Sequence, residues 1–374
     1  MSRRPPSLRP RLLDPHRLLP ALLPLLLVQA LLLALLLGAC ARQEPETDRL
    51  TFQAFGTLVD VTLYPAGLHD LASVEAELRG AMDTLHRSWH AWQPSELEQT
   101  NARLAGGEMF DAPASVLPLI ERGQEMERLS DGLFNPALGR LIAAWGFHQS
   151  EPAGPPPDSE WIEALLANPP RMRDIERDGM RLRGGHPELQ LDFGGLAKGL
   201  ALIQSLDLLT ELGVEQAIVN AGGDLMTLGR RPDRPWRIGL RDPRGSGVLA
   251  SIELGPGEAL FSSGDYERGY DWNGERIHHV IDPRSGHPSQ GVASATVLHV
   301  DPMLADAAAT TLMIAGPERW IRYARQLGAE HALVVLDDGT VELTPAMRAR
   351  IEFRRDVEYR LRNSPAADSM GSAP

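Results

Sequence analysis

The sequence is short of the residues that several common kinds of site require. Cys40 is its single cysteine, so the chain can form neither an internal disulfide nor a zinc or iron–sulfur site built on paired cysteines. It has no HExxH, GxSxG or P-loop motif, and no GxGxxG of the Rossmann type. Acidic residues outnumber basic ones by 50 to 37, a net charge of −13, which argues against nucleic acid as a partner.

Lysine is almost absent as well. Of the 37 lysine and arginine residues only Lys198 is a lysine, and it lies in the glycine-rich segment LDFGGLAKG, residues 191–199. The pattern predicts a strand, a double-glycine turn and a helix whose first N–H groups face an anion. A chance surface lysine is the alternative, but its isolation in this turn favours a phosphate contact through a compact positive charge.

The first forty residues differ from the rest. Several arginines precede a run of leucine and alanine over residues 18–37, which ends in Leu37-Gly38-Ala39-Cys40. An uncleaved membrane span is one interpretation. The small residues before the lone cysteine favour a cleaved export signal with a lipobox. We therefore predict a lipoprotein signal peptide over residues 1–39, lipidation of Cys40, a tether over residues 40–49, and a location on the periplasmic side of the inner or outer membrane.

The remainder predicts one large α+β unit over residues 50–350, followed by a charged tail over 351–374 that is disordered from Ser364. A strand pair is expected in 50–64. Helices are expected in 71–89, 114–129, 196–212 and from Asp301-Pro302 to Gly316, and a hairpin in 169–185. Further strands are expected in 188–192, 217–220, 236–240, 248–254, 259–262, 277–281, 292–300 and 332–336.

A second constellation is ADAAAT, residues 305–310. Asp306 and Thr310 are four residues apart, so on a helix they share a face. Such a pair is usually only the wet face of a helix, but this helix is otherwise apolar and is expected to be buried. A buried carboxylate needs a partner, and carboxylate and hydroxyl oxygens suit Mg²⁺.

Three further segments are less specific. HHVIDPRSG, residues 278–286, predicts a strand running into an Asp-Pro turn, with His279 as a bystander on these residues alone. NAGGD, residues 220–224, and FSSGDYERGY, residues 261–270, predict glycine-containing loops that admit a ligand against backbone.

Taken together and in order, these motifs are more specific than any one of them. With SELxxxN after residue 94 and HxIDPxSGxP after residue 278, the set resembles the ApbE-type FAD:protein FMN transferases, over about Phe52 to Met347. The resemblance implies an ApbE-like fold of mixed sheets and helices, and Mg²⁺-dependent transfer of FMN from FAD to a threonine or serine of another protein.

The resemblance also implies roles for residues of this chain. Mg²⁺ would be held by the Asp306 carboxylate, the Thr310 hydroxyl and the backbone oxygen of Gly195. FAD would be bound by Asp192, Lys198 and the strand of His279. Phe55 stands where the family often has Met, Asn135 replaces the usual Asp, and Trp92 aligns only with a one-residue gap. The implied flavin contacts are thus Phe55, Trp92, Leu133, Phe134, Asn135, Asp192, Lys198 and His279.

Three functions compete at this point: the transferase, an Mg²⁺-dependent FAD pyrophosphatase, and a flavin-binding lipoprotein without catalysis. The base is either His279 or Asp306. The chain lacks the DGx[ST]G[AS][ST] acceptor motif of the family's targets, so the acceptor is expected to be another protein. In the family, acceptors are membrane redox subunits of the Nqr and Rnf kind.

Overall fold

The computed structural model describes residues 47–67 and 70–363. The chain divides into two compact units, residues 1–46 and 47–374, and only the second contains described residues. The predicted signal peptide, Cys40 and the tail from Ser364 therefore lie outside the described residues. Among those described, no helix has the length and apolar character needed to cross a membrane.

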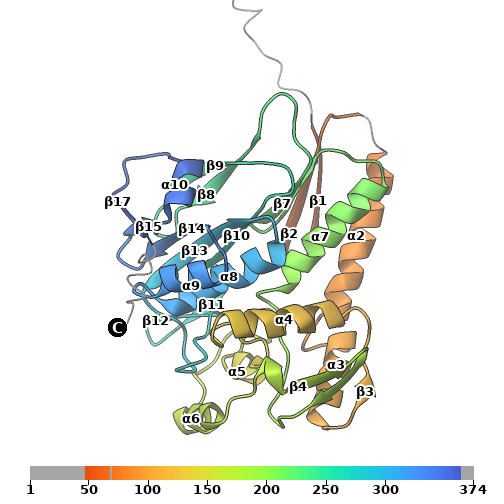
Figure 1. The fold of residues 1–374 in the computed structure, drawn as a ribbon, viewed down its shortest axis with the longest axis vertical. Helices are drawn as coiled ribbons and strands as arrows, with labels where there is room; N and C mark the ends of the chain where they lie inside the picture. The colour runs from red at the N-terminus through yellow and green to blue at the C-terminus, as the bar shows by residue number, and fades with distance from the viewer. Residues whose placement is uncertain (1–46, 68–69, 364–374) are drawn as a thin grey trace, which may run out of the picture. The chain divides into compact units, whose positions relative to one another are not determined.

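The α+β prediction is confirmed, and the centre of the fold is a nine-stranded sheet in the order β1-β2-β6-β7-β10-β13-β14-β15-β17 (Figure 1). Its neighbouring strands pair antiparallel except β15 and β17, which are parallel. The strands are β1 (Asp48–Ala54), β2 (Thr57–Leu63), β6 (Ala217–Ala221), β7 (Asp224–Leu228), β10 (Ala259–Gly264), β13 (Val292–His299), β14 (His331–Leu336), β15 (Val341–Leu343) and β17 (Tyr359–Leu361).

Both faces of this sheet are buried, because alternate side chains of a strand point to opposite faces. In β14, Ala332 and Val334 pack on the helical side, whereas Leu333 and Val335 pack on the other side. The helical side is covered by α2 (Leu71–Ser88), α7 (Ala197–Glu211), α8 (Pro302–Ala315) and α9 (Trp320–Gln326). The other side packs against a small sheet, β16-β9-β8, made of β8 (Trp236–Arg241), β9 (Val248–Leu254) and β16 (Ile351–Phe353), next to α10 (Pro345–Arg350).

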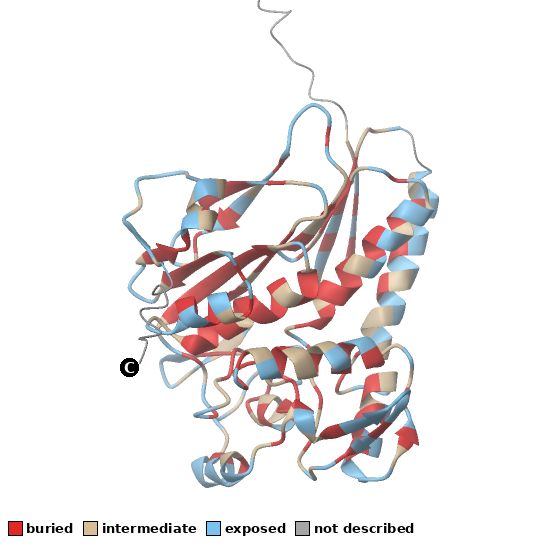
Figure 2. Ribbon diagram, in the orientation of Figure 1, coloured by how far each residue is buried: buried red, intermediate tan, exposed pale blue. Residues whose placement is uncertain are grey.

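The two helices that carry the predicted motifs cross at a glycine. Helix α8 is buried nearly all round, as Figure 2 shows, and Asp301 caps it by accepting a hydrogen bond from the Leu304 N–H. Gly199 of α7 faces its first turn, and a Cβ there would lie 2.7 Å from backbone atoms of Pro302 and Met303. This glycine therefore permits the close approach of α7 and α8.

We expect Gly199→Ala to destabilise the protein by about 1–3 kcal/mol, because the clash is with backbone and cannot be relieved by a rotamer change. Gly80 on α2 is the matched control: a Cβ there meets nothing within 4 Å, so Gly80→Ala should stabilise by about 0.5–1 kcal/mol. Urea unfolding of both variants measures the difference. Shifts of the same sign and size would contradict the close packing.

A second group of elements lies next to the helical layer, mostly below α7 and α8 in the view of Figure 1. The sequence did not predict most of them; the hairpin expected in 169–185 and the helix expected in 114–129 are present. The elements are α3 (Glu96–Ala105), β3 (Phe110–Asp111), α4 (Leu117–Leu129), α5 (Gly139–Ala144), α6 (Ser159–Ala167), η2 (Met172–Asp174), β4 (Ile175–Asp178), β5 (Arg181–Gly184), β11 (Gly269–Trp272) and β12 (Glu275–His278). Trp145, Phe147 and Ile162 join α5 and α6 to the β11–β12 hairpin in a small core of their own.

Two predicted strands are wrong. Residues 188–192 form only one bridge, Gln190 to Leu138, because the surrounding backbone groups bond elsewhere. The Asn101 side chain, for example, takes both the N–H and the carbonyl of Leu191. The strand expected in 277–281 ends at His278, whose Nδ1 accepts from the N–H of Val280 and turns the chain.

The predicted ends of the domain also need correction. Strand β1 begins at Asp48, inside the predicted tether. Strands β16 and β17 lie in the predicted tail and pair with β9 and β15. Part of the charge of this segment is paired within the fold, since Arg362 forms an ion pair with the buried Glu342 at 2.6 Å. The folded unit therefore extends at least to Leu361.

Candidate active site

The glycine turn before α7 has the predicted form. The Asp192 carboxylate accepts a hydrogen bond from the Gly194 N–H at 2.8 Å, and α7 starts at Ala197 without a side-chain cap. The Gly199 N–H donates to the Asp306 carboxylate at 3.3 Å. At the start of α7, one backbone N–H is thus taken by the Asp306 carboxylate, and the phosphate contact stays a prediction.

Asp306 and Thr310 both face this turn from α8. Asp306 is 5% exposed, and burial together with the nearby Asp224 raises its pKa, while Lys198 opposes the shift. The Thr310 Oγ1 lies 3.2 Å from the position that a Cβ would take on Gly195, and 3.1 Å from the hydroxyl of Ser263. Of the three predicted metal ligands, Thr310 and Gly195 are therefore adjacent, and the Asp306 carboxylate lies one turn earlier on α8, at Gly199.

Lys198 is held between acidic groups. Its Nζ forms an ion pair with Asp224, whose side chain is 4% exposed, and the charge of Asp306 also acts on it. Burial lowers the pKa of Lys198, but the carboxylates of Asp224, Asp306 and Glu267 together outweigh burial and raise it. The lysine is therefore fully protonated at neutral pH. Its ammonium is held by the Asp224 carboxylate rather than extended toward solvent.

The oxygen groups at this point fit a divalent cation. A buried carboxylate, a hydroxyl and the adjacent turn backbone are hard ligands, and Mg²⁺ commonly takes one or two carboxylates and completes its shell with phosphate and water. Within residues 47–67 and 70–363, no group of three His, Cys, Asp or Glu side chains has an arrangement that could hold a metal ion.

A second cluster surrounds Asp192. The charges of His90 and Arg268 act on its carboxylate, and Trp92 hydrogen-bonds to it. Burial raises the pKa of Asp192, and these partners oppose the shift. Arg268 is anchored by the carbonyl of Gln149, and His90 accepts the Trp92 N–H at 3.1 Å. Two predicted flavin contacts, Asp192 and Trp92, therefore lie together.

Aromatic rings extend this cluster. The Phe55 ring lies 5.5 Å from His86 and 6.3 Å from Trp89, and His86 lies 5.7 Å from His90. Phe55 adopts a φ of +51° in the β1–β2 turn, which is rare for a bulky residue. The ring of Trp92 lies 5.9 Å from His148. The turn and the end of α2 thus present a row of rings next to Asp192.

His279 belongs to the same region. Its Nδ1 donates to the Arg268 carbonyl at 3.2 Å, which leaves Nε2 as the acceptor of a neutral ring. Its ring lies 6.3 Å from Phe147. Burial, and then the neighbouring His278, lower the pKa of His279 to about 3, and the charge of Lys198 also contributes.

The three residues of segment 133–135 have different surroundings. The Phe134 ring lies 3.2 Å from a Cβ placed on Gly195, beside the predicted metal ligands. Leu133 is buried in the main core. Asn135 uses both ends of its amide on backbone, donating to Pro170 and accepting from Ala137. Flavin contacts by Leu133 and Asn135 stay predictions, and the structure gives each of them a packing or loop role.

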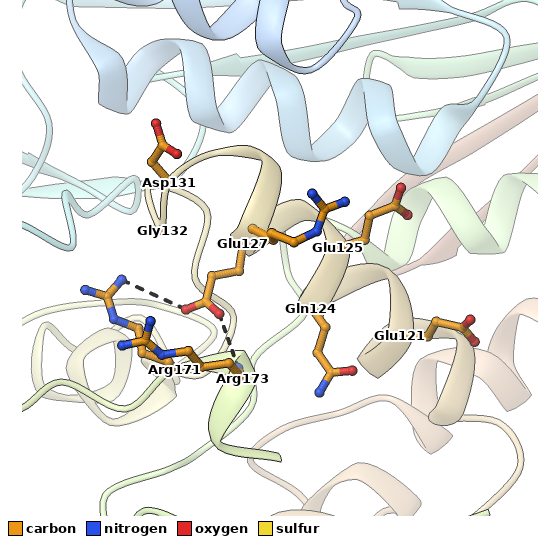
Figure 3. Close-up of a pocket in the computed structure, with 9 residues that line it drawn as sticks. Glu121, Gln124, Glu125, Glu127, Asp131, Gly132, Arg171 and Arg173 are labelled. Carbon is orange, nitrogen blue, oxygen red and sulfur yellow. Dashed lines mark hydrogen bonds and ion pairs between the residues drawn. The ribbon is translucent and has the colours of Figure 1, made fainter. Parts of the chain in front are cut away.

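A hollow of about 920 Å³ beside α4 and η2 contains none of these residues (Figure 3). Within it, Glu127 accepts a hydrogen bond from the Arg173 N–H and faces Arg171 at 3.9 Å. Its lining carries both signs of charge, and Asp131 pairs outward with Arg322. We place the chemistry at the start of α7, where the titratable groups are buried and converge.

Sequence reasoning missed several residues of the site. Asp224 and Arg268 lie in the two glycine-containing segments that were expected only to admit a ligand by their backbone. His90 follows α2 and carries no motif. An acidic residue directly after Gly-Gly was the one signal for Asp224 that the sequence offered.

Comparison with known proteins gives a consistent result. A sequence model of the ApbE family matches residues 55–334. The FAD:protein FMN transferase of Rhodobacter capsulatus is 42% identical over 302 residues, which are 81% of this chain but only 58% of that protein. The Vibrio cholerae enzyme of the same name is 28% identical over 318 residues, or 83% of this chain and 94% of that protein.

Solved structures agree in fold. The ApbE protein of Thermotoga maritima has a TM-score of 0.75 and 28% identity, and covers 83% of this chain and 100% of its own. The apo flavinyl transferase ApbE of Pseudomonas stutzeri has a TM-score of 0.72 and 30% identity, with 83% and 98% covered. By its matched sequence, its fold and these relatives, the chain belongs to the ApbE family.

Proposed function

We propose that this chain is an FAD:protein FMN transferase, which attaches FMN to a threonine or serine of a partner protein and releases AMP. The observation that carries the proposal is the meeting of Lys198, Asp306 and Thr310 at the start of α7, next to a row of aromatic rings. The first group suits a pyrophosphate, and the rings suit isoalloxazine.

The reaction exchanges the phosphoanhydride bond of FAD for a phosphoester bond to the acceptor. The acceptor hydroxyl attacks the phosphorus of the FMN half of FAD, the bond from that phosphorus to the AMP phosphate breaks, and AMP leaves. The ammonium of Lys198 stabilises the negative charge that develops on the phosphate oxygens. Asp306, Thr310 and the backbone at Gly195 would hold Mg²⁺, which supplies Lewis-acid neutralisation of the pyrophosphate when bound.

The acceptor hydroxyl must lose a proton, and His279 is the better candidate for the base. Its Nε2 is unprotonated at neutral pH, because Nδ1 holds the ring proton against the Arg268 carbonyl. Asp306 is already engaged by the Gly199 N–H and by the charge of Lys198. Asp192, Trp92 and Phe55 would position the flavin and adenine ends of FAD.

A variant tests the role of His279. His279→Ala should lower kcat by about 10²-fold or more, which is the usual loss on removal of a general base. Because the folded pKa lies near 3, the wild type should keep its base unprotonated from pH 8 down to about pH 5, so this group adds no acid limb in that range. Unchanged kcat in His279→Ala would contradict the assignment, and a wild-type acid limb at pH 6.5 that disappears in the variant would contradict the low pKa of His279.

Two other functions remain as outcomes of experiment. With water in place of the acceptor hydroxyl, the same site would hydrolyse FAD to FMN and AMP. A binding protein would need no cation beside the pyrophosphate, so the buried carboxylate of Asp306, on the same helix as the Thr310 hydroxyl, disfavours it. Measuring AMP and protein-bound FMN in one reaction separates the three functions. Equal amounts of the two products support transfer, and AMP without bound FMN supports hydrolysis. If neither product forms, the result supports a binding protein.

The acceptor and the location belong to the proposal as well. We infer an acceptor of the Nqr or Rnf type, a membrane redox subunit, reached from a lipid anchor on the periplasmic side of the inner or outer membrane. Cys40 is the chain's single cysteine and ends the apolar N-terminal segment.

Cys40→Ser should abolish incorporation of labelled fatty acid and leave a precursor that retains residues 1–39, since no other thiol can replace it. Immunoblots of membrane and soluble fractions, with metabolic labelling, measure this. Normal processing and labelling of the variant would refute the anchor without affecting the transferase proposal.

A further inference from the structure

Asp224 is a buried carboxylate that the proposed chemistry does not use. It follows the Gly222-Gly223 turn as the first residue of β7, in the middle of the main sheet. It is 3% exposed. A buried carboxylate without partners is costly, so the contacts of Asp224 indicate what it does.

Both oxygens of Asp224 are engaged. Oδ1 accepts the backbone N–H of Ser262 on β10 at 2.9 Å, and Oδ2 pairs with the ammonium of Lys198. The first contact fixes the carboxylate on the neighbouring strand, and the second fixes the lysine to the carboxylate. Because β7 and β10 are hydrogen-bonded neighbours, the position of the Asp224 carboxylate is rigidly fixed.

Strand β10 also contacts the predicted metal ligands on the opposite side of the site. Ser263, next to Ser262, hydrogen-bonds to the hydroxyl of Thr310 on α8. The ammonium and the predicted metal ligands are therefore set relative to one strand, β10. Rigid elements hold a charged group to the precision that transition-state stabilisation requires.

We propose that Asp224 is a positioning residue, which holds the single lysine of the chain beside Asp306, in place for the phosphate oxygens. The expected effect of Asp224 on FMN transfer rests on the proposed function, whereas its contact with Lys198 does not. A negative charge near a pyrophosphate opposes binding of FAD. The Asp224 carboxylate is therefore explained by its placement of Lys198 and not by a gain in ground-state affinity for FAD.

The first arm of the test needs no turnover. Lys198 is the only lysine, so acetylation by an N-hydroxysuccinimide ester, read by mass spectrometry at the peptide that contains it, reports on that side chain alone. Asp224→Asn keeps an oxygen for the Ser262 N–H but removes the charge. Acetylation should be about tenfold faster, because each unit of amine pKa lost with a carboxylate partner multiplies the free amine by ten.

The matched control is Glu342→Gln, which removes another buried, ion-paired carboxylate, on β15. Its Lys198 should be acetylated at the wild-type rate. Unchanged acetylation in Asp224→Asn would overturn the proposal, as would equal acceleration in both variants.

The second arm is kinetic. In Asp224→Asn, kcat should fall by about 10²-fold, the loss typical of a misplaced catalytic group, while KM for FAD stays level or falls. Asp224→Glu, which keeps the charge and displaces it, should lie between wild type and Asp224→Asn, and serves alone if the asparagine variant does not fold. Unchanged kcat in a variant with a freed lysine would overturn the role.

The two proposals fail in different ways. If the wild type transfers no FMN, the transferase proposal fails, and the acetylation arm still decides whether Asp224 holds Lys198. If the wild type is active and the asparagine variant equals it in both arms, only the positioning role fails.

Discussion

Asp306→Ala should reduce FMN transfer by at least about 10³-fold, the loss of several kcal/mol expected when a metal-held transition state loses its charged ligand. The carboxylate is buried on α8, faces the start of α7, and lies where Thr310 and the Gly195 turn offer further oxygens. Chelation of the wild type should have the same effect, with activity restored by Mg²⁺. Initial rates with and without chelator measure both.

Two controls separate the metal site from helix stability. Thr310→Val removes a neutral ligand and should have a smaller effect than Asp306→Ala, visible as a higher Mg²⁺ requirement. Asp301→Ala removes the cap of the same helix and should cost about 1 kcal/mol of stability without changing the Mg²⁺ requirement. If Asp306→Ala lowered only the melting temperature and kept wild-type metal dependence, the carboxylate would be structural, and the binding-protein function would return.

Lys198→Ala should lower kcat by about 10²–10³-fold, as removal of one preorganised charge-stabilising donor does. It should also destabilise the protein, because Asp224 and Asp306 lose their shared cation in a buried setting. Stopped assays of transfer and urea unfolding measure the two effects. This stability cost does not follow from the sequence, in which neither carboxylate is near the lysine.

Two further variants sharpen the test. Lys198→Arg should not restore activity, because a planar guanidinium does not occupy the place of a compact ammonium between two carboxylates. Lys198→Ala combined with Asp224→Asn removes one charge of each sign and should recover stability but not kcat. Recovery of kcat in the double variant, or a fully active arginine variant, would contradict a direct role of Lys198 at the phosphates.

The sequence predicted the local structure of the site well. The four-residue spacing of Asp306 and Thr310 predicted a shared face on a buried helix, and the double glycine predicted the turn that meets it. Both are confirmed, since helix periodicity and glycine turns depend on neighbours along the chain. The cap Asp301 and the end of α8 at Gly316 were predicted for the same reason.

What the sequence could not predict depends on contacts between distant segments. Asp224 meets Lys198 only because α7 packs over β7. Arg268 reaches Asp192 because the β11–β12 hairpin packs on α5 and α6. The tail was misjudged because its arginines look solvated in sequence, whereas Arg362 is neutralised by a buried glutamate. None of these pairings leaves a periodic signal.

The central claim is covalent transfer of FMN, and intact-mass measurement of an acceptor tests it directly. The purified protein, FAD, Mg²⁺ and an acceptor subunit carrying the flavinylation motif are incubated, with the Asp306→Ala protein as the matched control. We expect the acceptor to gain the mass of one FMN less water at its threonine or serine, and one AMP to appear for each acceptor modified. An acceptor of unchanged mass, with FAD intact or converted only to free FMN and AMP, would contradict it.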